Sequence, residues 1–158
     1  MYLPKRYFSG LSETKRRLRK KELTRRSKLS WRDQKAYRPF KTDKGVKTRK
    51  SKYTLSWEKK FPKSKSLEKM SKSSGVPVKY LKEVFNRAKA AWTHGHRVGA
   101  TPEQWGYARV RSFLLKGKTY YTADSDLVKQ AKESSESSKS WWSKQPNQTY
   151  RRKAVLLR

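Results

Sequence analysis

Cysteine is absent from this chain of 158 residues, and long apolar runs are absent too. Without cysteine the chain forms no disulfides and no thiolate metal sites, and its composition does not indicate a redox compartment. No apolar run approaches the roughly 20 residues that a membrane-spanning helix needs, so membrane contact is not indicated. The first residues also lack the apolar stretch of a signal peptide, and we expect a protein that is not secreted.

Acidic residues are scarce, and basic residues are abundant. Lys and Arg number 43 and Asp and Glu only 12, which gives a formal net charge of +31, and the mean hydropathy is −1.17. Because like charges at this density repel one another in a compact fold, we expect a small folded part with extended arms on a large polyanionic or acidic partner. Six Trp, nine Tyr and five Phe are too many for a simple solvated tail, and they predict a small core or docking into a partner.

The residue pattern predicts a mostly α-helical protein in three parts. Residues 1–62 are expected to form a long irregular basic arm, with one helix over about 13–27 that Ser12 caps. Residues 63–132 show helical periodicity and are expected to form a small helical domain, near the lower size limit for independent stability. Residues 133–158 are expected to form a Ser-rich linker and a basic tail.

Start and stop signals predict the main helices of the helical domain. A helix over about 64–73 ends at Gly75, a residue that tolerates positive φ, and a helix over 77–94 carries one apolar stripe. Thr101 and Gln104 form a capping box for a further helix, which reaches about residue 115. The residues expected inside the domain are Val78, Leu81, Phe85, Trp92, Trp105 and Phe113.

Two shorter segments complete the helical domain. Residues 119–122, Thr-Tyr-Tyr-Thr, indicate a short extended piece. Asp124 or Ser125 then caps a helix that reaches about Glu133. Asp124 and Asp126 lie where the positive end of a helix dipole favours acidic side chains, which explains this pair without acid–base chemistry or Mg²⁺.

Aromatic residues recur through the arm and the tail at spacings that do not form a helical face. We interpret the arm as a strap whose rings dock into clefts of neighbouring proteins, because nonspecific duplex binding needs few aromatic anchors. On this hypothesis most of the six rings in the arm are exposed on the isolated chain. The expected anchors are Trp31, Tyr37, Phe40, Tyr53, Trp57, Phe61, Trp141 and Trp142.

A second candidate site surrounds the predicted loop at residues 95–101. His96 and Arg97 lie on this loop, where packing gives no reason for basic residues, and Arg109 and Arg111 lie on the helix that follows. A loop beside a helix N-terminus with basic side chains is a suitable site for a phosphate or an acidic group of a partner.

The sequence does not favour catalysis. His94 and His96 flank a glycine, but there is no cysteine and no carboxylate at a recognised ligand spacing, so a metal site is not favoured. No Ser-His-Asp order, P-loop or Gly-rich phosphate cradle is found. We therefore predict a protein that is not an enzyme, with no metal, no cofactor and no small-molecule substrate.

Several strings within residues 5–130 are specific enough to indicate a family. They include Arg6-Tyr-Phe-Ser-Gly-Leu-Ser, Tyr37-Arg-Pro-Phe-Lys-Thr-Asp-Lys-Gly, His94-Gly-His-Arg-Val-Gly-Ala-Thr-Pro-Glu-Gln-Trp and Gly117-Lys-Thr-Tyr-Tyr-Thr. These strings resemble small basic proteins of algal large DNA viruses, chlorella viruses among them, and of tailed phages. That family carries no established activity, so the resemblance implies a setting, the virus particle, and no chemistry. The chain departs from the family pattern at His94 and in its Trp-rich tail.

Two functions agree with these features. The first is a minor capsid protein that cements or bridges subunits beneath the shell, with other capsid proteins as its partners. The alternative is a virion-packaged protein that binds double-stranded DNA nonspecifically and neutralises or condenses the genome. In both cases we expect the protein to be made in the infected host cell and located in the virion. Net charge does not separate an acidic protein surface from nucleic acid, and the aromatic anchors favour the first function.

Overall fold

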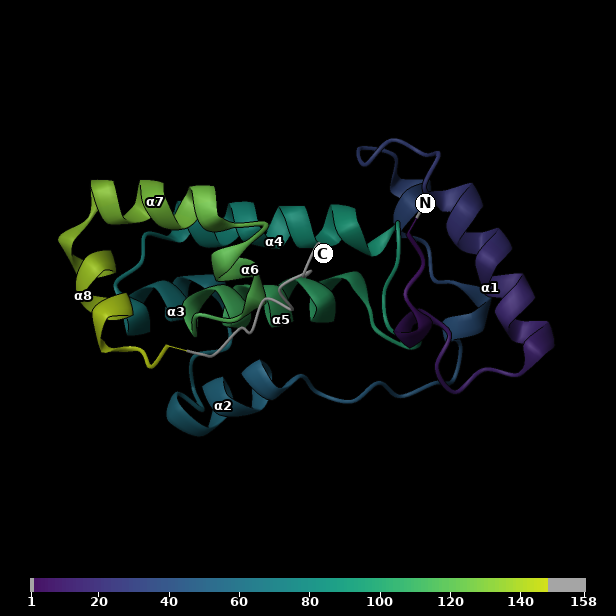
Figure 1. The fold of residues 1–158 in the computed structure, drawn as a ribbon, viewed down its shortest axis with the longest axis horizontal. Helices are drawn as coiled ribbons and strands as arrows, with labels where there is room; N and C mark the ends of the chain where they lie inside the picture. Colours follow the sequence, from purple (N-terminus) through teal and green to yellow (C-terminus); the bar gives the residue numbers. More distant parts are fainter. Residues whose placement is uncertain (1, 148–158) are drawn as a thin grey trace, which may run out of the picture. The chain divides into compact units, whose positions relative to one another are not determined.

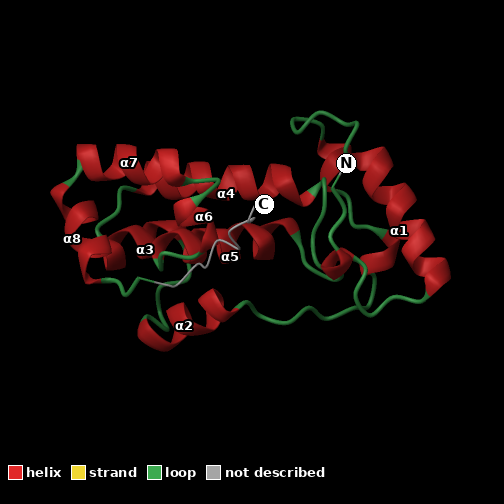
Figure 2. Ribbon diagram, viewed as in Figure 1, coloured by secondary structure: helices red, strands yellow, loops and turns green. Residues whose placement is uncertain are grey.

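The structure, a computed structural model, describes residues 2–147 (Figure 1). Helices and connecting loops make up this part of the chain, without a strand, which confirms the predicted mostly α fold class (Figure 2). The helices separate into two compact units. Unit 1 contains the residues up to Lys50 together with Phe85–Tyr107, and unit 2 contains Ser51–Val84 together with the residues from Ala108 onward. No helix within residues 2–147 is long and apolar enough to cross a membrane.

This division differs from the predicted arm, domain and tail at 1–62, 63–132 and 133–158. The residues up to Lys50 pack with Phe85–Tyr107 in unit 1, because aromatic rings and buried hydrogen-bonding side chains of both segments contact each other. The tail contributes a helix to unit 2. Residues 148–158, which include the predicted basic end, lie outside the described residues.

Unit 1 is built around α1 (Glu13–Arg26), whose first turn is capped by Ser12 as predicted. Short 3₁₀ turns lie at Lys5–Tyr7, Gln34–Tyr37 and Lys41–Asp43. The later part of α4 (Val78–Trp92) and the first part of α5 (Pro102–Leu114) complete the unit. The core consists of Leu23, Phe40 and Trp92, with Leu3, Phe8, Tyr37 and Trp105 packed against it.

Up to residue 147, unit 2 contains five helices of its own: α2 (Lys52–Lys60), α3 (Leu67–Ser74), α6 (Lys118–Tyr121), α7 (Ser125–Ser134) and α8 (Glu136–Lys144). Its core contains two buried tryptophans, Trp57 and Trp142. The Trp142 ring lies 5.3 Å from the Phe113 ring and 5.5 Å from the Tyr120 ring, centroid to centroid. The indole N–H of Trp57 donates to the carbonyl oxygen of Ser64 at 3.0 Å, so its polar atom is satisfied inside the core.

The predicted helices of the central region are confirmed as α3, α4, α5 and α7. Gly75 has φ +76° and ends α3, as its position predicts. The capping box at α5 forms in both directions: the Gln104 N–H donates to the Thr101 hydroxyl at 3.1 Å, and the Thr101 N–H donates to the Gln104 side chain at 3.0 Å. Of the predicted inward residues, Leu81, Trp92 and Phe113 are buried, and Val78, Phe85 and Trp105 are partly buried.

Three helices were not predicted. The predicted extended piece at 119–122 is wrong, because residues 118–121 form the helical turn α6. Helix α2 forms where an irregular arm was expected, and helix α8 forms where a Ser-rich linker was expected. Both helices are rich in Lys and Ser and contain few apolar residues. Each helix contributes one fully buried tryptophan, Trp57 from α2 and Trp142 from α8, and this tertiary burial outweighs their modest intrinsic helix propensity.

Candidate functional site

Helix α1 is strongly basic and has two different faces. Its 14 residues include eight Lys or Arg and two Glu. The buried face consists of Arg19, Glu22, Leu23 and Arg26. The opposite face consists of exposed residues that line one open groove, namely Arg17, Lys20, Lys21, Thr24, Arg25 and, just past the helix end, Lys28. The 3.6-residue helical period places these two sets on opposite sides.

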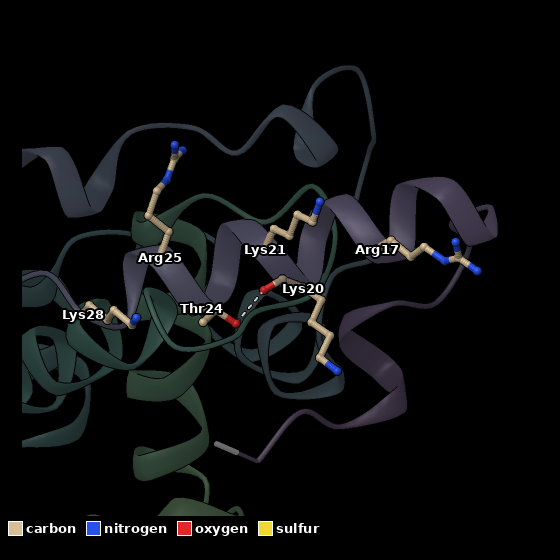
Figure 3. A pocket seen from close by; sticks show the side chains of 6 residues that line it. All are labelled: Arg17, Lys20, Lys21, Thr24, Arg25 and Lys28. Carbon is tan, nitrogen blue, oxygen red and sulfur yellow. Dashed lines mark hydrogen bonds between the residues drawn. The ribbon is translucent and has the colours of Figure 1, made fainter.

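The exposed face of α1 presents cations along its length (Figure 3). From Arg17 to Lys28 the side chains cover about 16 Å at 1.5 Å rise per residue. Arg17 pairs with Glu13 at 2.7 Å, but both side chains are strongly exposed, and such a pair contributes little to stability. The exposed face of α1 is therefore a row of cations on one side of an ordered helix.

Arg19 connects the buried face of α1 to two other segments of unit 1. Its Nη1 donates to the Asp43 carboxylate at 2.8 Å and to the Thr42 hydroxyl at 3.0 Å. Its Nη2 donates to the carbonyl oxygen of His96 at 2.7 Å. The side chain is fully buried, so these charge-assisted bonds compensate for the cost of removing the guanidinium from water.

Asp43 receives hydrogen bonds from three directions. Besides Arg19, the backbone N–H of Gly99 donates to it at 2.9 Å, and Nε2 of His96 lies 2.6 Å from its Oδ2. Burial by itself raises the pKa of Asp43. The hydrogen bond from His96, the charge of that ring, the Gly99 N–H and the charge of Arg19 together outweigh burial, so the pKa of Asp43 lies below its usual value.

Arg26 fixes the loop that follows α1. Its Nη1 donates to the carbonyl oxygens of Lys35 and Arg38, the latter at 2.9 Å. Burial and then the neighbouring charge of Arg25 lower the pKa of Arg26, but a guanidinium remains charged at physiological pH. The same helix face holds Glu22, which accepts from the Thr42 hydroxyl at 2.8 Å. The basic helix therefore has a defined orientation within unit 1, and the cations of its exposed face are carried by an ordered backbone.

His96 does not belong to a phosphate site, which corrects the prediction for this residue. It is fully buried, its Nδ1 donates to the Trp92 carbonyl oxygen at 2.9 Å, and its Nε2 contacts Asp43. In the sequence, His96 is a loop histidine among basic residues, which favoured a binding role. In the structure, its acidic partner is Asp43, which lies 53 residues earlier in the chain. Arg97, beside it, is exposed.

Arg109 and Arg111, predicted for the same site, belong to unit 2 and have protein partners there. Arg109 forms a bidentate pair with Asp124, at 2.8 and 2.7 Å. Arg111 is buried, and its Nη1 donates to the Thr54 hydroxyl at 3.4 Å. The prediction of one phosphate site from His96, Arg97 and these two arginines is therefore wrong for all but the exposed Arg97.

Seven of the eight predicted aromatic anchors are buried or partly buried within this chain, which corrects the expectation that most of the rings in the arm are exposed. Phe40, Trp57 and Trp142 are fully buried. Tyr37, Tyr53, Phe61 and Trp141 are partly buried, and only Trp31 among the eight is exposed, at 59%. The reason is that α1 and α2 fold back onto later segments of the chain, so each ring buries its surface within its own unit.

The structure brings no metal-binding cluster together in the part that it describes: residues 2–147 contain no group of three or more His, Asp or Glu suited to holding an ion. His94 is exposed, and its Nδ1 lies 2.9 Å from the Thr93 hydroxyl and 3.2 Å from the Ala90 carbonyl oxygen. His94 and His96 therefore have separate surroundings.

The buried network of unit 1 was missed in the sequence, although a signal for it exists. Residues 1–53 contain only four acidic residues, and each of them has a partner. Asp33 accepts from the Lys35 N–H at 2.8 Å, and the other three take part in the contacts described above. In so basic a segment a rare acid indicates a specific structural contact, and the four are Glu13, Glu22, Asp33 and Asp43.

The chain belongs to a family of unknown function, DUF5824, whose model matches residues 4–132. This range includes all of α1, the Asp43 and His96 network, and the helices up to most of α7. No curated protein and no solved structure matches the chain.

Proposed function

We propose that this protein is a non-enzymatic, virion-packaged protein that binds and neutralises double-stranded DNA through the exposed face of α1. The observation that carries the proposal is a shared face of five cationic side chains, four on the ordered helix α1 and Lys28 just past its end. Such an array releases counterions from DNA, which gives sequence-independent affinity. The setting in a virus particle is supported only by the resemblance of its sequence strings to proteins of algal viruses and tailed phages.

The location of the aromatic rings supports nucleic acid over an acidic protein as the main partner. Binding of a strap in protein clefts needs exposed aromatic anchors, and Phe40 and Trp57 are buried inside the chain itself. The exposed face of α1 instead offers cations at regular helical intervals. Phosphate contacts of this kind position a protein on a duplex without reading its sequence.

The test is a salt titration of duplex binding by the full chain, with two triple variants of equal charge. Lys20→Ala, Lys21→Ala and Lys28→Ala together remove three cations from the face. Each lost phosphate contact lowers the slope of log K against log salt by about 0.9, so we expect a decrease of roughly 2.7.

The matched control removes three exposed lysines of unit 2, Lys69, Lys72 and Lys82. Both triple variants change the net charge by the same amount, so a general effect of a highly basic chain cancels in the comparison. Equal slopes for the two variants would contradict the proposal, because binding would then be spread over the whole surface.

A second candidate function is that of a minor capsid component, with other capsid proteins as partners. Its candidate contact is Leu55 on α2, which is 54% exposed, whereas Trp57 on the same helix is buried. Single exposed leucines are common on protein surfaces, so the test of this function is whether Leu55 is needed in the particle. For this function, Leu55→Ser would reduce incorporation into particles and leave the salt dependence of DNA binding unchanged.

A further inference from the structure

The loop after α1 presents an exposed tryptophan on a fixed backbone. The Trp31 side chain is 59% exposed, yet its carbonyl oxygen accepts from the Tyr37 hydroxyl at 2.7 Å. Burial raises the pKa of Tyr37, so this hydroxyl remains a donor at physiological pH. The flanking backbone is fixed as well, because the Asp33 N–H donates to the Ser30 carbonyl oxygen at 2.9 Å. A large apolar ring exposed on an ordered loop is suited to contact with a partner, since little entropy is lost on binding.

The chemistry around this ring is that of a stacking surface. The guanidinium carbon of Arg32 lies 4.8 Å from the centroid of the Trp31 ring, within the range of a cation–π contact. Arg32 is exposed, so a charge suited to phosphate lies directly beside the ring.

Trp31 is also close to the basic face of α1. It lies three positions after Lys28, the last cation of that face, so their Cα atoms lie at most about 11 Å apart. Arg26, on the buried side of the helix, donates to the Lys35 and Arg38 carbonyl oxygens and holds this loop against the helix end. The Trp31 loop therefore lies next to the end of the cationic face, within unit 1.

We propose that Trp31 stacks on an unpaired base, so that α1 and the Trp31 loop together bind single-stranded nucleic acid in addition to duplex. This inference rests on the proposed function, because the cations of α1 supply the phosphate contacts. In a duplex both faces of nearly every base are covered by neighbouring pairs, so the ring gains contact only where a strand is open. Aromatic stacking beside a basic groove is the usual means of binding single strands without sequence preference.

The experiment compares the full chain with Trp31→Ala, Trp31→Phe and Tyr2→Ala, by fluorescence anisotropy on a labelled mixed-sequence single strand and on its duplex. Tyr2 is the matched control, because it is a strongly exposed aromatic residue of the same unit. Stacking of one base contributes enough that Trp31→Ala should weaken single-strand binding by about 5- to 100-fold. Duplex binding should remain nearly unchanged, Trp31→Phe should retain most of the affinity, and Tyr2→Ala should bind as the wild type does.

Two outcomes would overturn the inference while leaving the proposed function standing. In the first, Trp31→Ala loses affinity equally for the single strand and the duplex. In the second, Trp31→Ala loses no affinity for either. Both apply when the α1 triple variant still lowers the salt slope. The second outcome would assign the exposed ring to a protein contact. If the α1 triple variant and its unit 2 control behave alike, the proposed function itself fails. Far-ultraviolet circular dichroism of each variant checks that it is folded, which the exposure of Trp31 leads us to expect.

Discussion

His96 is held inside unit 1 by contacts on both sides of its ring and at both nitrogens. A carbonyl oxygen, that of Trp92, and a carboxylate, that of Asp43, face the two nitrogens, and both groups accept hydrogen bonds. The ring also stacks on Trp92, with centroids 4.2 Å apart and planes 13° from parallel. Phe40 lies edge-on to the same ring, with centroids 4.9 Å apart, so the imidazole is enclosed by partners of its own unit. One histidine thus links the end of α4 to the Lys41–Asp43 turn.

Replacing His96 should destabilise the protein strongly. His96→Ala removes the stacked ring and leaves the buried Asp43 carboxylate with one fewer donor, and losing one partner of a buried pair costs about 3–5 kcal/mol. We expect the free energy of unfolding, measured by urea titration, to fall by about 3 kcal/mol. His94→Ala is the matched control, because His94 is exposed, and surface substitutions usually change stability by less than about 0.5 kcal/mol. Similar losses for the two variants would contradict the structural role of His96.

The lowered pKa of Asp43 predicts a loss of stability in acid. A carboxylate whose folded-state pKa lies below its unfolded value of about 3.9 stabilises the fold above that value, and this contribution disappears as the pH falls through the folded-state pKa. We expect the wild type to lose stability between about pH 5 and pH 2, and Asp43→Asn, which cannot ionise, to lose less over the same interval. Urea titrations at a series of pH values give the comparison. If the difference between the two proteins is the same at pH 7 and pH 2, Asp43 does not contribute through its charge.

At the scale of elements, α1 is buried through polar side chains and has almost no apolar stripe. Leu23 is the only fully buried apolar residue of the helix, and Arg19, Glu22 and Arg26 occupy the positions around it. The two arginines reach backbone carbonyl oxygens of distant segments, and their stems cover apolar surface while the guanidinium groups bond. Phe40 packs beneath them, with guanidinium carbons 5.6 and 5.1 Å from its ring centroid. This burial leaves every position of the opposite face available for exposed cations.

The capping box at the start of helix α5 is a local interaction that can be tested separately. Thr101 and Gln104 bond each other's backbone and are both exposed, so their substitution changes capping without disturbing a core. Loss of an N-cap side chain costs typically about 1 kcal/mol, and we expect Thr101→Ala to lower the free energy of unfolding by that amount. Thr101→Ser keeps the acceptor and should restore most of the loss. A Ser variant as unstable as the Ala variant would show that the hydroxyl is not the source of the effect.

At the scale of the whole molecule, acidic and basic side chains are distributed unequally between the interior and the surface. This distribution allows a chain of high net charge to fold. Acidic residues are few, and several are used inside the units, where Asp43 and Asp124 each neutralise a buried or partly buried arginine. Lysines such as those on the outer face of α1 remain at the surface, where solvent and salt screen their repulsion. A chain of +31 can therefore form two units, each with its own core, and its exposed cations remain available for the proposed contact with nucleic acid.

The sequence by itself determined the fold class and the central helices. Helix caps such as Ser12 and the Thr101–Gln104 box, and the positive φ of Gly75, depend on neighbours within a few residues, so local sequence is sufficient to predict them. Net charge likewise needs no structure.

Only the tertiary structure decided which residues are available for binding. Phe40 and Trp57 resemble exposed anchors in the sequence, and His96 resembles a loop ligand, but their exposure depends on segments far away along the chain. Asp43 lies 24 residues from Arg19 and 53 from His96, and no local pattern encodes that meeting. Periodicity also assumes that buried helix faces are apolar. In α1 the buried face is formed mainly by arginine and glutamate, because hydrogen bonds from distant segments satisfy charges that a short stretch of sequence would assign to water.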